Sequence, residues 1–130
     1  MSTRSVVRIK KSHVNEYGKN KNFKIDLYHH HDGYIEGVGF DLFNRFYDKE
    51  NKKINIPSDI MKVADILIKD NQDEYMVTPY NHCDIEYFYE ININNKTITA
   101  WSVNNWEKSM VKLRKFTHND ILKKYLKIEV

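Results

Sequence analysis

The chain has 130 residues, 41% of them hydrophobic, and a formal net charge of +3, which is milder than most dedicated nucleic-acid binders carry. This composition supports one domain, residues 1–130, whose core needs no metal, and the lone Cys83 excludes an internal disulfide and indicates a reducing compartment. No apolar run approaches the roughly 18 residues of a membrane span, and no signal-peptide core is present. We therefore expect a cytoplasmic protein without a membrane partner.

The first elements expected along the chain are two strands and a helix. Apolar residues among charges predict a strand over residues 5–10. After a polar loop, strict alternation of apolar and polar residues predicts a second strand over residues 23–28. From residue 38 to 47 the apolar positions recur at helical spacing, with Asp41 and Arg45 on the exposed side.

The middle of the chain predicts a loop, a second helix and a short strand. Residues 49–55 are rich in lysine and asparagine and read as a loop. A helix then opens at residues 57–59, with Ser58 or Asp59 as its cap, and carries an apolar stripe to Ile68. Residues 75–77 form a candidate strand that Pro79 stops.

The last third of the chain predicts a hairpin and a helix. Two β-rich runs, 85–93 and 97–103, flank Asn94-Asn95, a two-residue turn in which asparagine tolerates positive φ. A short helix follows Thr117, which caps it together with Asp120. The expected fold class is α+β: an antiparallel sheet of about four or five strands with two or three packed helices.

The segment 28–39 is unusual, because it holds three consecutive histidines and three of the four glycines. The glycines indicate backbone that needs positive φ or close approach. If the strand continued, His29 and His31 would share one side, and a metal centre would need both to converge with a carboxylate. The spaced Cys/His pairs of structural zinc are missing, so we expect no metal and no cofactor. Two interpretations stay open, a structural turn and a binding corner formed by Tyr28, His30, Asp32, Tyr34 and Glu36.

The sequence offers no set of catalytic residues. Cys83 follows His82, but catalytic pairs are made in space, and no oxyanion-type glycine turn accompanies them. Residues 37–39 resemble a phosphate-cradling loop, yet they lack the Walker Gly-Lys-Ser/Thr and the third glycine of a dinucleotide site. The pattern favours a binding protein over an enzyme.

Basic residues cluster at both ends of the chain, whereas the middle is acidic. Two solvated faces of opposite charge account for this pattern, and a phosphate-facing patch is the alternative. The hypothetical phosphate or nucleic-acid contacts are Arg4, Arg8, Lys112, Arg114 and Lys115. Aromatic residues of the hairpin, and Trp106 beyond it, could stack on bases, but in a sheet they more often build the core face.

The first 47 residues carry a resemblance. The chain opens Met-Ser-Thr-Arg-Ser, and later reads Tyr-His-His-His-Asp-Gly-Tyr-Ile-Glu-Gly-Val-Gly. It resembles a family of small phage and bacterial proteins that open with MSTRS and carry the signature Y-x-H-W-D-G-Y-P-E-x-x-G. The positions that match the signature are His30, Asp32, Gly33, Tyr34, Glu36 and Gly39, whereas His31 and Ile35 replace its tryptophan and proline. The resemblance implies a setting in mobile elements rather than an activity.

Three functions follow as hypotheses. The first is a non-enzymatic protein-binding factor of a phage or mobile element, an inhibitor of a host defence complex of the CRISPR type. Its partner would be a host protein or ribonucleoprotein in the host cytoplasm, and tyrosine and arginine are favoured interface anchors. The second is a small ligand- or nucleotide-binding domain, or an enzyme, using His30, Asp32, Tyr34 and Glu36. The third is a nucleic-acid-binding regulator that uses the terminal basic clusters.

Overall fold

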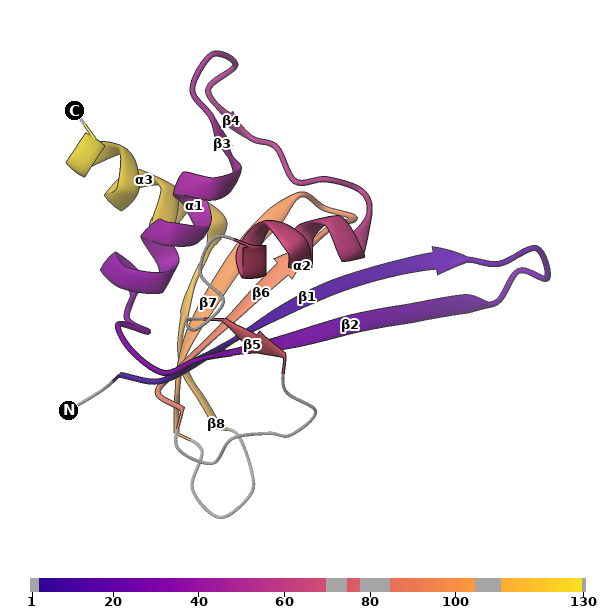
Figure 1. Ribbon diagram of the computed structural model, residues 1–130, viewed down its shortest axis with the longest axis horizontal. Helices are drawn as coiled ribbons and strands as arrows, with labels where there is room; N and C mark the ends of the chain where they lie inside the picture. The colour runs from indigo at the N-terminus through magenta and orange to yellow at the C-terminus, as the bar shows by residue number, and fades with distance from the viewer. Residues whose placement is uncertain (1–2, 70–74, 78–84, 105–110, 130) are drawn as a thin grey trace.

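The computed structural model describes residues 3–69, 75–77, 85–104 and 111–129. Within these residues it has a six-stranded sheet, a separate two-stranded sheet and three α-helices (Figure 1). The predicted α+β class is confirmed. The elements in chain order are β1 (Ser5–Val14), β2 (Asn20–His29), the π-helical turn η1 (Ile35–Gly39), α1 (Phe40–Phe46), β3 (Tyr47–Asp48), β4 (Lys53–Ile54), α2 (Ile60–Lys69), β5 (Met76–Val77), β6 (Tyr87–Asn92), β7 (Thr97–Asn104), β8 (Val111–Phe116) and α3 (His118–Glu129).

The large sheet has the strand order β5-β2-β1-β6-β7-β8. Its pairs are antiparallel, as predicted, with one exception: β1 and β6 run parallel. A parallel pair needs a long crossover, and here the chain passes through η1, α1 and α2 between β2 and β6. The first strand of the chain therefore lies in the interior of the sheet.

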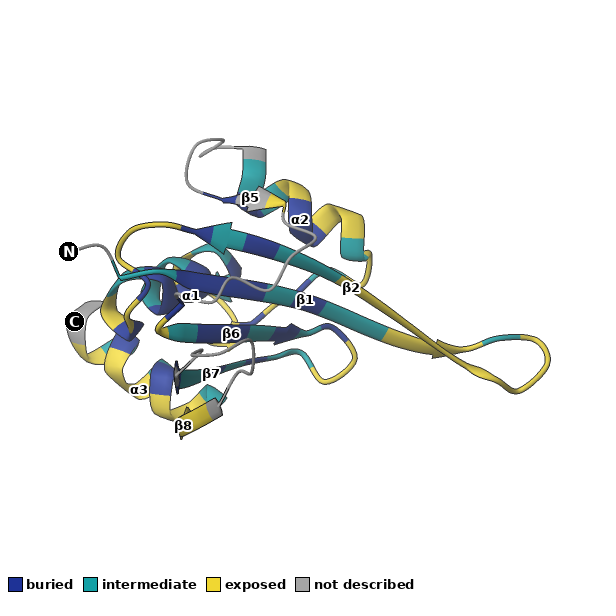
Figure 2. Ribbon diagram, turned by 90° about the horizontal axis from the view of Figure 1, so that it is seen from below, coloured by how far each residue is buried: buried dark blue, intermediate teal, exposed yellow. Residues whose placement is uncertain are grey.

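The main core lies between one face of the sheet and the three helices (Figure 2). Its strands contribute alternate residues to that face, and the helices contribute their apolar stripes. Burying each large apolar side chain contributes roughly 1.5–3 kcal/mol. The core side chains without exposed surface include Val7, Ile9, Leu27, Leu42, Phe43, Val63, Leu67, Tyr89, Ile91, Ile98, Ala100 and Ile121.

A smaller apolar cluster lies on the opposite face of the sheet. Val6, Ile85, Phe88 and Val103 are buried there, with Tyr28 and Trp101 packed against them. The ammonium of Lys112 lies 4.1 Å from the centre of the Trp101 ring, and the guanidinium of Arg8 lies 5.1 Å from the centre of the Phe88 ring. The hairpin aromatics thus pack into the two faces of the sheet, as the sequence predicts.

Beyond the body of the protein, β1 and β2 continue as a two-stranded ribbon (Figures 1 and 2). The antiparallel register runs without interruption to Val14 opposite Asn20. The side-chain oxygen of Asn15 closes the turn by accepting the backbone N–H groups of Tyr17 and Lys19, and Gly18 supplies a φ of 77°. The predicted polar loop is therefore wrong for residues 11–14 and 20–22, which are paired strands whose polar side chains give no alternating pattern.

Three further details differ from the prediction. The hairpin turn spans residues 93–96, and its positive φ falls on Lys96 rather than on the asparagines. Within the loop predicted over 49–55, residues 53–54 form β4, which pairs with β3 just before the loop, at residues 47–48. No strand was predicted at the run that forms β8, although Val111 and Leu113 alternate there with Lys112 and Arg114, and it pairs with β7, with a bulge between Ser102 and Val103.

The helix starts follow the predicted caps. Asp59, rather than Ser58, caps α2, because its carboxylate accepts the backbone N–H of Met61 at 3.0 Å. At α3, Thr117 and Asp120 exchange side-chain-to-backbone bonds of 3.0 and 3.2 Å, which confirms the predicted cap. Among the described residues, no helix combines the length and apolar character that a bilayer span requires.

Candidate functional site

The segment 28–39, here called the corner, has a backbone fixed by its neighbours. β2 ends at His29, and Asp32 adopts a φ of 53°, a conformation that few residues other than glycine accept. The carbonyl of Asp32 accepts the N–H of Val38 at 2.9 Å, and a Cβ at Gly37 would overlap that same carbonyl. A Cβ at Gly33 would lie 2.8 Å from Ser5 and from the carbonyl of Thr3. The predicted close approach is confirmed for Gly33 and Gly37, whereas a Cβ at Gly39 would meet only ordinary contacts from 3.4 Å.

A buried hydrogen bond anchors the corner to the core. The hydroxyl of Tyr89, on β6, donates to the carbonyl oxygen of Gly33 at 2.6 Å, while the N–H of Gly33 donates to Thr3 at 2.8 Å. Burial raises the pKa of Tyr89 well above its usual value, so this phenol stays a donor. The corner is therefore held at both backbone polar groups of one residue, the N–H and the carbonyl of Gly33.

Four of the five predicted corner side chains meet in two pairs. The hydroxyl of Tyr28 lies 3.0 Å from Nδ1 of His30, and the hydroxyl of Tyr34 donates to Asp32 at 3.3 Å. The charge of Asp32 raises the pKa of Tyr34. Glu36 instead faces α3, where its carboxylate lies 3.5 Å from the ammonium of Lys124.

The three histidines are grouped differently from the prediction. His29 is buried, with its ring 4.7 Å from that of Tyr75, whereas the rings of His30 and His31 contact each other at 4.6 Å. The prediction that His29 and His31 share a side is wrong, because β2 ends at His29 and the alternation stops there. In the described part of the chain, no three His, Cys, Asp or Glu side chains are arranged to hold a metal ion. His82 and Cys83 lie outside the described residues.

Beneath the corner is a small hollow of about 180 Å³, lined by His29, Asp32 and Asp41 among others. It is smaller than the roughly 300 Å³ at which ligand pockets usually begin. Beside it, the carboxylate of Asp41 accepts the Tyr75 hydroxyl at 2.8 Å and Nε of Arg45 at 2.9 Å.

This network engages the groups that could perform acid–base chemistry. Arg45 also donates to the carbonyl of Ile66 at 2.9 Å and its side chain is only 11% exposed, so its predicted place on the exposed side of the helix is wrong. Burial, followed by the charge of Asp41, raises the pKa of Tyr75. The guanidinium of Arg45 thus joins α1 to α2, and the phenol of Tyr75 joins the start of β5 to α1.

Three of the five predicted phosphate contacts, Arg8, Lys112 and Lys115, lie on the face of the sheet away from the helices, whereas Arg114 lies on the other face. Arg8 binds Asp26 through two bonds of 2.8 and 3.1 Å, and this carboxylate raises the pKa of Arg8. Lys112 lies with Arg8 over Phe88, on the face away from the helices. Arg114 lies over Phe116, which packs against the main core on the other face. The backbone of Arg4 accepts bonds just before β6, and Lys115 lies opposite Trp101.

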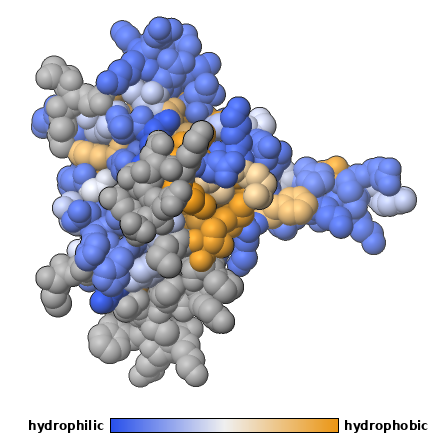
Figure 3. Space-filling view, in the orientation of Figure 1, coloured by the Kyte–Doolittle hydropathy of each residue, from blue (hydrophilic) through white to orange (hydrophobic). Residues whose placement is uncertain are grey.

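The basic surface that the prediction missed is the ribbon of β1 and β2. We call residues 10–24 the arm. It holds five lysines and one glutamate, a formal net charge of +4 against +3 for the whole chain, so the rest of the chain is nearly neutral. Figure 3 shows the arm as a mostly hydrophilic projection. The alternating lysines of the run Lys-Asn-Lys-Asn-Phe-Lys at residues 19–24 were the available signal.

Three lysines of the arm are unengaged within the described structure. Lys10 pairs with Glu90 at 2.9 Å, and Lys11 donates to the carbonyl of Ser58 at 2.6 Å. The exposed ammonium groups of Lys19, Lys21 and Lys24, in contrast, take part in no hydrogen bond or ion pair among the described residues. The positive charge of the arm is therefore available to an external partner.

A groove of about 610 Å³ runs along the base of the arm. One wall is formed by β1 and β2 and the other by the end of β6 and the turn after it. The side chain of Asn94 fixes this turn to β1, accepting the N–H of Ser12 at 2.8 Å and donating to its carbonyl at 2.7 Å. The lining residues are Arg8, Lys10, Lys11, Ser12, Asn22, Phe23, Lys24, Glu90, Asn92, Asn94 and Asn95.

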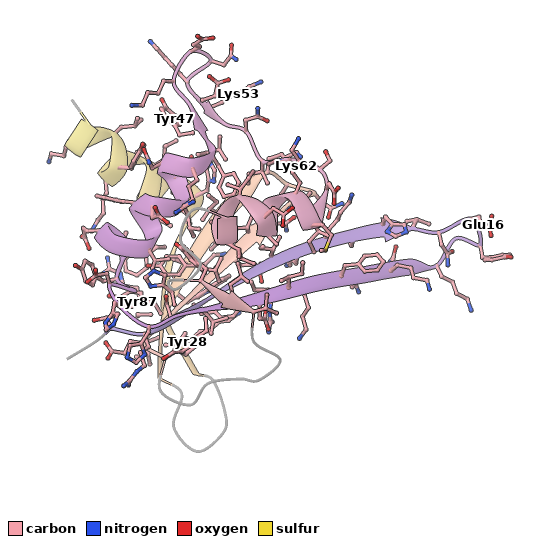
Figure 4. The ribbon with its side chains drawn as sticks, in the orientation of Figure 1. Glu16, Tyr28, Tyr47, Lys53, Lys62 and Tyr87 are labelled. Carbon is pink, nitrogen blue, oxygen red and sulfur yellow. The ribbon has the colours of Figure 1, made fainter. Side chains whose placement is uncertain are left out.

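The corner and the arm tip are separate surfaces. Figure 4 places Tyr28 at one end of β2 and Glu16 near the tip of the arm, at the other end. Ten extended residues span about 30 Å, so the two surfaces cannot act on one small ligand. The chain thus presents the corner and the charged arm as two separate surfaces. Comparison of the chain with protein-family models, with curated proteins and with solved structures finds no match, and the resemblance over residues 1–47 stays a prediction.

Proposed function

We propose that this protein is a non-enzymatic nucleic-acid-binding factor and that the arm is its main binding surface. The observation that carries the proposal is the concentration of charge, since residues 10–24 hold a net charge of +4 on a ribbon that extends into solvent. Phosphate backbones are bound mainly by such lysines, which release condensed counterions. The third hypothesis from the sequence is kept, but its surface moves from the terminal clusters to the arm.

The charged groups of the molecule divide into internal and external ones. Arg8 forms an ion pair with Asp26, and Lys10 forms one with Glu90. Their charge is therefore largely neutralised within the protein. Lys19, Lys21 and Lys24 have no such match among the described residues. A single carboxylate, Glu16, opposes them on the arm. An approaching polyanion therefore meets a surface with an excess of positive charge, which increases its association rate.

The shape of the arm supports the same proposal. A two-stranded ribbon without a covering layer is only marginally stable alone, and from Ser12 to Lys24 almost every residue is exposed. Lys19, Lys21 and Lys24 gain little from the rest of this protein, because their ammonium groups bond to no other described residue. These lysines are stabilised most when a partner of opposite charge lies along the ribbon and neutralises their mutual repulsion.

The proposal is tested by two triple variants that remove the same charge from different surfaces. Fluorescence anisotropy would measure the binding of labelled DNA and RNA, single-stranded and duplex, by the triple variant Lys19→Gln, Lys21→Gln, Lys24→Gln. Each lost single-strand phosphate contact lowers the slope of log K against log salt by about 0.7, so the three together lower it by about two.

The matched control is Lys62→Gln, Lys123→Gln, Lys127→Gln, which removes the same charge from exposed helix positions. It keeps the slope of the unmodified protein. No binding of any probe at low salt, or equal losses in the two triple variants, would show that the arm is not a nucleic-acid site.

The corner supports a second candidate function, the capture of a host protein. The supporting observation is that Tyr34 is 40% exposed on backbone fixed by buried glycine contacts, which suits an interface anchor. The resemblance adds a phage or mobile-element setting and a defence ribonucleoprotein as partner. Affinity capture from host lysate tests it: Tyr34→Ala loses the partner, whereas Tyr17→Ala on the arm keeps it. Equal capture by both variants contradicts this role.

A further inference from the structure

We infer that the nucleic acid bound by the arm also lies across the outer face of the sheet, where it contacts Lys112 and Lys115 on β8. The outer face is the face of the six-stranded sheet opposite α1, α2 and α3. This inference rests on the proposed function and extends its binding site from the arm to the body of the protein. It depends on the strand registers, on the sign and exposure of the charged groups, and on the distance across the sheet.

The strand registers bring ammonium groups from the arm and from β8 to the same face. Alternate residues of a strand share a face, so Lys10 lies on the same side of β1 as Val6, a member of the small outer cluster. Lys24 lies directly opposite Lys10 in the pairing of β2 with β1. On β8, Lys115 lies opposite Trp101, whose ring packs against the same cluster. The base of the arm and the last strand of the sheet therefore present cations to one side of the molecule.

Positive charge is in excess on the outer face. Its strands place there five cations and two carboxylates, Arg8, Lys10, Lys24, Lys112, Lys115, Asp26 and Glu90, a net charge of +3. Both carboxylates are engaged, because Asp26 accepts two bonds from Arg8 and Glu90 pairs at 2.9 Å with a lysine of β1. Arg4 and Glu86, just before β1 and β6, carry opposite charges and leave the excess unchanged. A phosphate backbone therefore meets attraction along this face.

The two cations of β8 are accessible. Lys112 and Lys115 are exposed, and neither takes part in an ion pair or hydrogen bond among the described residues. The ammonium of Lys112 lies 4.1 Å from the centre of the Trp101 ring and 5.8 Å from that of Phe88. An ammonium over aromatic rings keeps its charge and is attracted to the ring faces. The rings thus position this cation on the outer face, where a phosphate can reach it.

The next cation on β8 points to the other side of the sheet. The guanidinium of Arg114 lies 4.7 Å from the centre of the Phe116 ring, which packs against the main core beneath the helices. Arg114 and Lys115 are adjacent and both are exposed, but they lie on opposite faces. A contact specific to the outer face must therefore distinguish these two neighbours.

The arm and β8 are close enough for one nucleic acid to contact both. In the order β2-β1-β6-β7-β8, four strand spacings of about 4.8 Å separate Lys24 from the last strand, which is about 19 Å. Figure 2 shows these strands side by side. Phosphates of one duplex strand follow each other at about 3.4 Å along the axis, so about six base pairs span this distance. A probe of about 20 nucleotides covers the arm and the outer face together.

The experiment measures salt-dependent binding by the full-length protein, with a DNA strand of about 20 nucleotides and the duplex of the same length as anisotropy probes. In the variant Lys112→Gln, Lys115→Gln the slope of log K against log salt is expected to fall by about 1.4 for the strand and about 1.8 for the duplex, since two phosphate contacts are lost. Lys115→Gln alone leaves Lys112 over its rings and loses about half of this. The control Arg114→Gln, Lys123→Gln removes the same charge and keeps the slope. Thermal unfolding confirms that each variant is folded.

The outcomes separate this inference from the proposed function. If the outer-face variant keeps the slope, or if the control loses as much, the outer face is not a contact surface and the inference is overturned. The proposed function still stands in that case when the triple variant of the arm lowers the slope. Titration at protein concentrations well above the Kd is expected to give at most one probe per protein, and two would show that the arm and the outer face bind separate molecules, which overturns the shared path. If no probe binds at low salt, the proposed function itself fails.

Discussion

The corner and the arm are built on opposite principles, although one strand, β2, connects them. At the corner, the position of each peptide is fixed by a neighbour, as the Tyr89–Gly33 bond and the space beside Gly37 show. Along the arm, side chains face solvent and pairing within the ribbon is the main constraint. The contrast teaches that stability resides at one end of the strand and free charge at the other.

The largest expected effect comes from adding a methyl group at the corner. In Gly37→Ala the new Cβ overlaps the carbonyl of Asp32, which is itself bonded to Val38, so the turn has to shift. We expect a loss of about 3 kcal/mol in the free energy of unfolding, measured by urea denaturation. The control is Gly18→Ala on the arm, where space is open but φ is 77°, and the loss is about 1 kcal/mol. Equal losses would mean that the corner is no more constrained than the arm.

A smaller effect is expected from removing one hydroxyl. Tyr89→Phe leaves the buried carbonyl of Gly33 without its donor, which costs about 1–3 kcal/mol. Tyr17→Phe, at a residue that is 80% exposed on the arm, changes the free energy of unfolding by less than about 0.5 kcal/mol. Urea denaturation measures both variants. A similar change in the two would contradict the proposed anchoring role of Tyr89.

The smallest expected effect is a pH dependence of stability caused by His118, which attaches the start of α3 to the sheet. Nδ1 of His118 accepts the N–H of Ile98 at 3.0 Å, and burial lowers the pKa of His118 from its ordinary 6.5. The unfolded chain therefore binds this proton more readily, so stability is full above about pH 6.5 and is lost as pH falls toward the lowered folded pKa.

Thermal melts of the protein across this pH window, compared with those of His118→Gln, isolate the contribution. The variant is expected to lose part of the slope of stability against pH. An unchanged slope would show that protonation of His118 does not oppose folding.

The sequence predicted the fold where apolar residues repeat and failed where they do not. The helices, the core strands and the cap at Thr117 follow from periodicity and local chemistry. The outer half of the arm is mostly polar and three of the six residues of β8 are basic, so their pairing depends on neighbours that the local pattern does not contain. The parallel pair of β1 and β6 is likewise a consequence of the crossover and not of either strand alone.

For the candidate site, the sequence identified many of the residues but not how they are arranged in space. The residues of the corner were identified, and Tyr28 does meet His30, but the end of β2 at His29 reversed the expected grouping of the histidines. The burial of Arg45 depends on Tyr75 and Ile66, which are distant in the sequence. The charge of the arm was visible in the sequence, but its projection away from the body required the sheet register.

The position of β1 inside the sheet has a consequence for biosynthesis. One neighbour, β2, leaves the ribosome soon after it, but the other side of β1 must wait for β6, and Ser12 meets Asn94 across 82 residues. Contacts so distant in sequence close slowly. The nascent chain therefore exposes an unpaired strand edge for much of its synthesis, and the lysines that follow along the arm protect this edge from pairing with other chains.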